Sequence, residues 1–215
     1  VQLAHHLYDK RMLLVLDNLE QVLSGAPLIA ELVQHTQALK LLVTSRERLN
    51  VQGEWVLELQ GLRFPEQERV EDAETYGAVR LFLERARHIN HDFAPDADEL
   101  AAVVRICHLV QGMPLGLELA AAWTRLLSCH EIADEIAVSL DFLTLSLRDL
   151  PERHQSLRAV FAHSWGLLSR EERACYCALS VFRGGFTRAA AVEVAAASLP
   201  LLASLMDKSM LYRAT

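Results

Sequence analysis

Two short apolar runs are the feature that most constrains how this chain of 215 residues can fold. Met12–Leu16 ends abruptly at Asp17, and Lys40–Thr44 ends just before Ser45 and Arg46. Nearly continuous apolar runs of strand length are typical of parallel strands that helices cover on both faces. The stretch between the two runs is long enough for a right-handed crossover through a helix. The runs therefore predict two parallel strands of an α/β domain.

A third strand is predicted at Trp55–Leu59, so that the first part of the chain would belong to a doubly wound α/β domain. Residues 66–74 are rich in acidic side chains and indicate an exposed connector. Residues 1–150 carry 13 basic and 23 acidic side chains, whereas residues 151–215 carry 8 basic and 5 acidic ones. Because the sign of the charge changes there, a domain boundary is expected near Pro151.

The rest of the chain has the apolar spacing of helices. Helices are predicted over residues 76–89, from Asp96 or Asp98 to about Val110, over 115–127, and over about 155–166, 170–180 and 188–197. Gly112 is expected to stop the second of them in the left-handed conformation. Capping boxes at Ser128–Glu131 and Ser169–Glu172 predict two helix starts. Three helices followed by the strand-like residues 209–212 are the layout of a winged helix.

Composition excludes several classes of protein. The net charge of −7 argues against proteins that coat nucleic acid, and an apolar content of 52% argues against a disordered tail. No apolar run approaches the roughly 20 residues that cross a bilayer, and the first residues do not resemble a signal peptide, so a cytoplasmic location is expected. The four cysteines are expected to be reduced and buried, and none of the nine histidines is assigned to a metal.

Asp17 and Arg46 are the residues best suited to chemistry, because parallel strands present their carboxyl ends at one edge of the sheet, where ligands bind. An acid after an apolar strand has the form of a Walker B segment, whose carboxylate holds the water shell of Mg²⁺. An arginine after the next strand can contact a terminal phosphate through two hydrogen bonds. The alternative is a loop arginine paired with Glu47 or Glu20.

Three ordered motifs give the chain a resemblance to a known family. They are LVLDNLE at 14–20, VTSRERL at 43–49 and QGMPLGLELAAA at 111–122. In this order they resemble the Walker B, sensor 1 and GxP motifs of STAND-class signalling ATPases. The likeness is greatest to the NB-ARC-like modules of large bacterial LuxR-type and SARP-type transcriptional regulators, and it continues through residues 153–158, 164–169, 179–186 and 205–209.

The fold that this resemblance implies is α/β plus all-α. Residues 1–64 would form the C-terminal part of a nucleotide-binding α/β domain with a P-loop NTPase-type parallel sheet. Residues 65–140 would form a helical lid subdomain that carries the GxP motif, and residues 141–215 a winged-helix subdomain.

The resemblance also implies a role for each matching residue. Five residues would contact bound ATP or ADP: Asp17, Asn18, Thr44, Arg46 and Pro114. Asp17 would coordinate Mg²⁺ through water, Arg46 would contact the terminal phosphate, and Pro114 would pack against the adenine. Asn18 stands where many ATPases have a catalytic glutamate, and Glu20, the nearest acid, is the candidate for that catalytic role. Hydrolysis in the complete protein is therefore expected to be slow at most.

The sequence contains no GxxxxGK[ST] loop to cradle phosphates. In the resembling family this loop precedes the Walker B strand, and a winged-helix histidine motif follows the last residues that match. The chain is therefore expected to be a fragment, inactive by itself and binding ATP poorly. In the complete protein it would be a switch that responds to ATP or ADP.

Two other functions, a nucleotide-free scaffold and a DNA-binding winged helix, are alternatives to the nucleotide switch. The missing phosphate loop equally suits a nucleotide-free scaffold, a degenerate homologue kept for protein contacts. The expected partners are a second copy or other regulatory protein domains, and no membrane. A DNA-binding winged helix at 141–215 is disfavoured, because its predicted third helix, residues 187–195, carries a single arginine. DNA would be contacted through another domain.

Overall fold

The computed structural model describes residues 2–36, 38–66, 72–144 and 156–213. The chain forms two compact units, one made of Val1–Leu57 together with Ser164–Thr215 and the other of Glu58–His163. Within the described residues it is mostly helical and has one small parallel sheet of two strands. The three-part division predicted at residues 64 and 140 stays a prediction.

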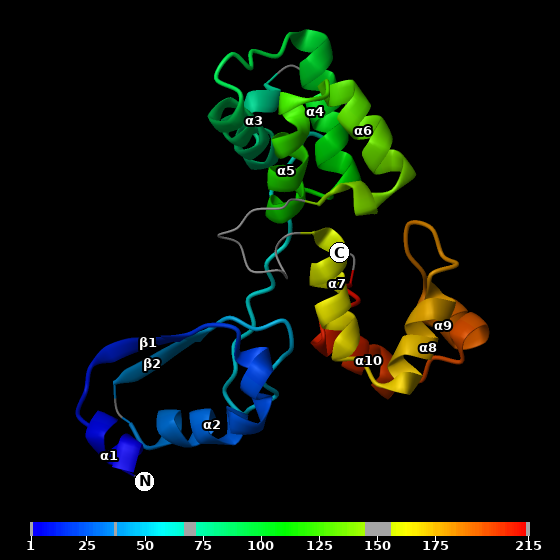
Figure 1. The fold of residues 1–215 in the computed structure, drawn as a ribbon. Coiled ribbons are helices and arrows are strands. Elements are labelled where there is room, and N and C mark those ends of the chain that lie inside the picture. The colour runs from blue at the N-terminus through cyan, green and yellow to red at the C-terminus, as the bar shows by residue number, and fades with distance from the viewer. Residues whose placement is uncertain (1, 37, 67–71, 145–155, 214–215) are drawn as a thin grey trace. The chain divides into compact units, whose positions relative to one another are not determined.

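The α/β part of the first unit alternates helix and strand (Figure 1). Its elements are α1 (Gln2–Leu7), β1 (Met12–Leu16), a 3-10 turn at Leu19–Gly25, α2 (Ala26–Gln34) and β2 (Leu39–Val43). The strands pair in parallel, with Met12 opposite Leu39 and Leu16 opposite Val43. Both predicted strands, and the helical crossover between them, are confirmed.

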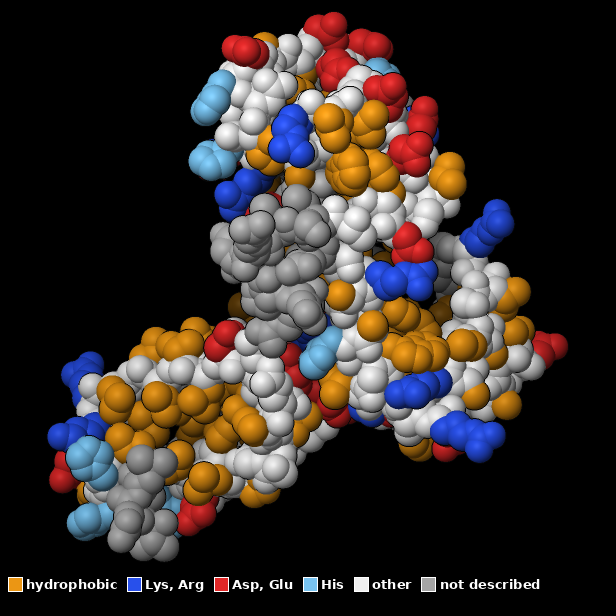
Figure 2. Space-filling view, in the orientation of Figure 1, with side chains coloured by type: hydrophobic (Ala, Val, Ile, Leu, Met, Phe, Trp, Pro, Cys, Tyr) orange, Lys and Arg blue, Asp and Glu red, His pale blue; other side chains and the backbone are white. Residues whose placement is uncertain are grey.

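The two faces of this sheet differ. Leu14 and Leu41 pack against the small core that includes Leu7 and Leu32. Leu13, Val15 and Leu42 point the other way and are 58%, 55% and 54% exposed. Figure 2 shows hydrophobic side chains gathered over this part of the molecule. The expectation that helices cover both faces is therefore wrong for the described residues, where they cover one.

The predicted third strand at Trp55–Leu59 is also wrong. These residues have irregular structure, and the side chains of Trp55, Leu57 and Leu59 are 94%, 84% and 87% exposed. A strand needs the N–H and C=O groups of a neighbouring strand, and the two-stranded sheet of the described residues does not extend to this segment. The alternation of apolar residues at Trp55–Leu59 was therefore not sufficient to form a strand without a partner strand.

The second unit is a group of helices around one apolar core (Figure 1). Its elements are a 3-10 turn at Ala73–Thr75, α3 (Gly77–Ile89), α4 (Ala97–Leu109), α5 (Pro114–Ala121), a 3-10 turn at Ala122–Arg125, α6 (Cys129–Val138) and a 3-10 turn at Leu140–Phe142. α4 packs against α6, and α3 against α5. Phe82, Ile106 and Ile132 are completely buried between them. The helix predicted over 115–127 ends earlier, at Ala121.

Helix ends follow the predicted caps closely. Asp96 accepts hydrogen bonds from the N–H groups of Asp98 and Glu99 and begins α4. The capping box at Ser128–Glu131 begins α6 as predicted. Gly112 adopts the expected left-handed conformation, at φ +63°, but Gln111 before it is also left-handed, at φ +52°, and is the first residue after the C-cap Val110.

The C-terminal part of the chain is helical, with α7 (Leu157–Gly166), α8 (Arg170–Leu179), α9 (Arg188–Ala195) and α10 (Leu199–Asp207). The capping box at Ser169–Glu172 begins α8, as predicted. The strand expected at 209–212 is wrong. The N–H groups of Ser209 and Met210 donate back to the carbonyls of Met206 and Leu205, at 2.9 Å each, which closes the end of α10.

Most of the acidic connector at 66–74 and the motif residues 153–155 lie outside the described residues. In the described part of the chain, no single helix has the length and apolarity to span a membrane. α9 and α10 meet that test of length and composition only as a pair, with a bend of 105° between them.

All four cysteines are free thiols, but they differ in exposure. Cys107, Cys129 and Cys175 are buried, as expected, whereas Cys177 is exposed. Successive residues of a helix turn by about 100°, so the thiols at 175 and 177 leave opposite sides of α8. Burial raises the pKa of Cys107 to about 12.

The exposed thiol of Cys177 should therefore react quickly with an aromatic disulfide reagent in the native protein. The three buried thiols should react only after unfolding. Cys177→Ser should abolish the fast phase. Fast labelling that persists in this variant would contradict the burial of the other three cysteines.

Candidate functional site at the carboxyl edge of the sheet

The parallel register brings Asp17 and Thr44 together at the carboxyl ends of β1 and β2. The N–H of Thr44 donates to the carbonyl of Leu16 at 2.9 Å, and the N–H of Leu19 donates to the carbonyl of Thr44 at 3.0 Å, so pairing extends past both strands. The hydroxyl of Thr44 donates to Oδ1 of Asp17. The Asp17 carboxylate is therefore fixed by the neighbouring strand.

Asn18 completes this edge. Its N–H donates to Oγ1 of Thr44 at 3.0 Å, and its side-chain amide donates to Oδ2 of Asp17 at 3.1 Å. Asn18 adopts φ +55°, a left-handed conformation that asparagine tolerates better than most residues. Both carboxylate oxygens of Asp17 accept a hydrogen bond and keep further lone pairs, and the residue is exposed. An exposed, oriented carboxylate suits a hydrated divalent cation.

Arg46 lies beyond the end of β2, and its guanidinium contacts Glu20 and Ser164. Its Nε is 3.8 Å from Oε1 of Glu20, and its Nη1 donates to Oγ of Ser164 at 3.2 Å. The pairing with Glu20 is the alternative that the sequence left open. A phosphate bound through Nε or Nη1 would have to replace these partners.

Glu20 lies at the start of the 3-10 turn after β1 and is buried. Its Oε2 has no hydrogen-bond partner among the described residues. A buried carboxylate oxygen left in this state is costly, and its neighbour Arg46 offsets part of that cost. Glu20 thus pairs with Arg46 in this structure, and a role in activating water stays a prediction.

Pro114 belongs to the second unit, where it opens α5 at its first turn. Before it, the chain makes a tight turn against residues 61–64. The N–H of Leu62 donates to the carbonyl of Gly112 at 2.8 Å. A Cβ at Gly112 would lie 2.1 Å from the carbonyl oxygen of Leu62. The glycine of the GxP motif is thus required by local backbone packing.

Sequence reasoning missed three residues that contact the Arg46 loop. Ser164 contacts the guanidinium, Ser209 donates to the carbonyl of Arg46 at 2.8 Å, and the carbonyl of Asp207 accepts from the N–H of Arg48 at 2.9 Å. Ser164 and Asp207–Ser209 lie in the motifs at 164–169 and 205–209 that resemble the family. This resemblance was the one signal that could have found them, but it assigned no role to these residues.

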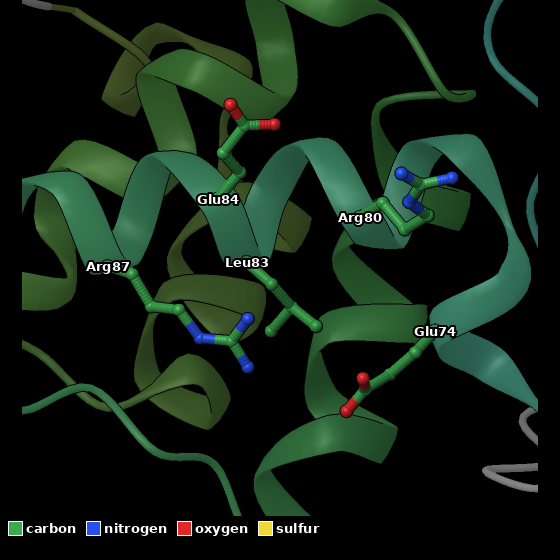
Figure 3. A pocket seen from close by; sticks show the side chains of 5 residues that line it. All are labelled: Glu74, Arg80, Leu83, Glu84 and Arg87. Atoms are coloured by element: carbon green, nitrogen blue, oxygen red, sulfur yellow. The ribbon is translucent and has the colours of Figure 1, made fainter.

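A separate hollow of about 350 Å³ lies on α3 and is lined by Glu74, Arg80, Leu83, Glu84 and Arg87. In Figure 3 the side chains of Glu74, Leu83 and Arg87 point toward one space, whereas those of Arg80 and Glu84 point away from it. It shares no residue with the edge of the sheet. No group of three or more His, Cys, Asp or Glu side chains gathers as a metal site within residues 2–36, 38–66, 72–144 and 156–213.

Comparison with known proteins finds relatives that are longer than this chain. No family model matches the chain, and no solved structure matches it. A Mycobacterium tuberculosis protein named "Putative HTH-type transcriptional regulator" is 35% identical over 210 residues, which cover 94% of this chain and 23% of that protein. A second M. tuberculosis protein, named only as uncharacterized, is 34% identical over 210 residues and is covered to 51%. Mycobacterium bovis has counterparts with the same identities. The chain thus spans about a quarter to a half of these relatives.

Proposed function

We propose that this chain is the ATP- or ADP-responsive switch module of a bacterial transcriptional regulator of the STAND class, with an NB-ARC-like arrangement. The observation that carries the proposal is the Asp17 carboxylate, which Thr44 and Asn18 orient at the carboxyl edge of the parallel strands. Arg46 follows the second strand. The name of the 35% identical relative supports a role in transcriptional regulation.

In this proposal Asp17 holds Mg²⁺ through water, and the bound cation would neutralise charge on the phosphates of ATP. Thr44 and Asn18 keep the carboxylate in place. The guanidinium of Arg46 leaves Glu20 and Ser164 and then contacts the terminal phosphate. Any hydrolysis is slow, because Asn18 follows Asp17 where a catalytic glutamate would polarise water.

DNA contact falls to another part of the regulator. α10 contains no lysine or arginine, and α9 contains only Arg188. A surface that reads or coats DNA needs concentrated positive charge. A gel shift of the 215-residue chain with duplex DNA at low salt is therefore expected to show no complex.

Calorimetric titration of Mg-ATP into the protein at its natural length tests the proposal. Asp17→Asn should weaken binding about 10- to 100-fold, as for other residues that orient a metal through a second layer of contacts. Asp134→Asn is the matched control, because Asp134 is an exposed carboxylate paired with Arg105 in the second unit. Bound Mg-ATP should also raise the melting temperature.

The second candidate, a nucleotide-free scaffold, is favoured by the engagement of Arg46 with Glu20 and Ser164 and by the missing phosphate loop. It predicts no heat of binding and no change in melting temperature with Mg-ATP. That result at the natural length would rule out the switch.

A further inference from the structure

The loop that follows β2 is held by the end of α10, about 160 residues later in the chain. Asp207 makes three contacts with it. Its carbonyl accepts from the N–H of Arg48 at 2.9 Å, its Oδ1 is 3.7 Å from Nε of Arg48, and its Oδ2 accepts from the side-chain amide of Asn50 at 3.4 Å. Asp207 thus contacts the backbone of the loop and the side chains of Arg48 and Asn50.

Arg46, at the start of this loop, is held through its backbone carbonyl and through its guanidinium. The hydroxyl of Ser209 donates to its carbonyl at 2.8 Å. Its guanidinium contacts Ser164, in α7, and Glu20, beside β1. Ser164 and Ser209 both come from the C-terminal part of the first unit. These helices therefore fix the position of the arginine that would meet a phosphate.

The residue between Asp207 and Ser209 anchors the contact. Lys208 is largely buried, and its ammonium donates to Oε2 of Glu172 at 2.8 Å and to the carbonyl of Leu167 at 3.0 Å. The backbone turn after α10 is closed by the bonds from Ser209 and Met210 described above. Lys208 and this turn thus tie Asp207–Ser209 to α8 and α10.

We propose that Asp207 and Ser209 are positioning residues that form a latch on the Arg46–Asn50 loop, and that this latch withholds Arg46 from a terminal phosphate. The inference rests on the proposed nucleotide site. A phosphate that accepts hydrogen bonds from Nε or Nη1 of Arg46 competes with Glu20 and Ser164, which these two atoms face. Asp207 and Ser209 hold the loop in the position from which the guanidinium of Arg46 reaches Glu20 and Ser164, so the closed latch favours these partners over the phosphate and opposes binding of a triphosphate.

Two consequences follow from this opposition. By reciprocity, a ligand that weakens the latch must bind more tightly when the latch is already broken. ADP lacks the terminal phosphate and should be less sensitive to the latch than ATP.

Trypsin cleavage after Arg46 and Arg48 measures the latch without any nucleotide. In the protein at its natural length, the double variant Asp207→Ala/Ser209→Ala should be cut at these bonds about tenfold faster, because cleavage follows the population of the open loop. The control is Asp134→Ala/Ser180→Ala. This control removes the same two side-chain types. Asp134 pairs with Arg105 in the second unit, and the hydroxyl of Ser180 donates to the carbonyl of Cys177, three residues earlier in the chain.

Ser164→Ala provides a milder variant that leaves the end of α10 intact. It should speed cleavage after Arg46 more than after Arg48, since Ser164 contacts Arg46. Wild-type cleavage rates in both the double variant and Ser164→Ala would overturn the latch.

Titration of Mg-ATP and Mg-ADP into the same proteins then tests the withholding of Arg46. The double variant should bind Mg-ATP several-fold more tightly than the wild type and Mg-ADP about equally. Unchanged Mg-ATP affinity, in a protein whose wild type binds Mg-ATP, would overturn the withholding. Absence of Mg-ATP binding to every protein would overturn the proposed function and this regulation with it, while faster cleavage in the variants would still support the latch itself.

Discussion

Lys208→Met should lower the free energy of unfolding of the first unit by about 3–5 kcal/mol, the usual cost when one partner of a buried ion pair is removed. Glu172 is 5% exposed and accepts from Ser204 at 2.6 Å, from the N–H of Ser169 at 2.6 Å and from Lys208 at 2.8 Å. Without Lys208 the carboxylate stays buried with its charge uncompensated. Urea unfolding followed by the fluorescence of Trp165, which packs against this core, measures the loss.

The same pair should make stability depend on acid pH. Burial by itself raises the pKa of Glu172, but hydrogen bonds from Lys208, Ser204 and Ser169 outweigh it and hold the pKa at about 2, below the ordinary 4.5. A folded-state pKa below the unfolded one stabilises the protein above pH 4.5, and this contribution, about 3 kcal/mol, is lost as the pH falls toward 2. Lys208→Met should flatten the profile in that range.

Glu131→Gln is the matched control for this pair. Glu131 occupies the same position of a capping box, at the start of α6, but it is exposed and contacts no lysine. Its replacement should cost much less than Lys208→Met. Equal losses in the two variants would mean that the capping box, and not the ion pair, accounts for the effect.

Gly112→Ala should destabilise the second unit by about 2–5 kcal/mol. A residue with a Cβ loses about 1–2 kcal/mol in the left-handed conformation that Gly112 adopts, at φ +63°. Its Cβ would also lie 2.1 Å from the carbonyl oxygen of Leu62, and overpacking of this kind costs about 1–3 kcal/mol. Trp123 stacks on Phe142 at 4.6 Å and reports unfolding of this unit.

Gly166→Ala is the control for Gly112→Ala. Nothing lies within 4 Å of a Cβ at Gly166, and its φ is not left-handed. At the end of α7 alanine should be neutral or should stabilise by up to about 1 kcal/mol. Wild-type stability of Gly112→Ala would show that the backbone of residues 61–64 can move away from the turn.

The candidate site was predictable as far as it depends on parallel strands. Strands that run in parallel end at one edge, so the pairing of β1 with β2 places Asp17 beside Thr44. Which of Glu20 and Glu47 pairs with Arg46 was not predictable. The burial of Glu20 and its contact with Arg46 depend on how the 3-10 turn after β1 packs.

The sequence by itself determined the local elements of this protein. The two strands, the left-handed conformation of Gly112 and both capping boxes follow from residues a few positions apart, so their signals are present in any short window. Trp55–Leu59 has an equally clear strand pattern but no partner strand in the described residues, and therefore it forms none.

Only the tertiary structure decided what surrounds Arg46. Ser164 lies 118 residues after it, and Ser209 lies 163 residues after it. No local preference links positions so far apart. Their contact exists because the packing of α7 and α10 brings Ser164 and Ser209 to the loop after β2, and packing depends on all the side chains of the core together.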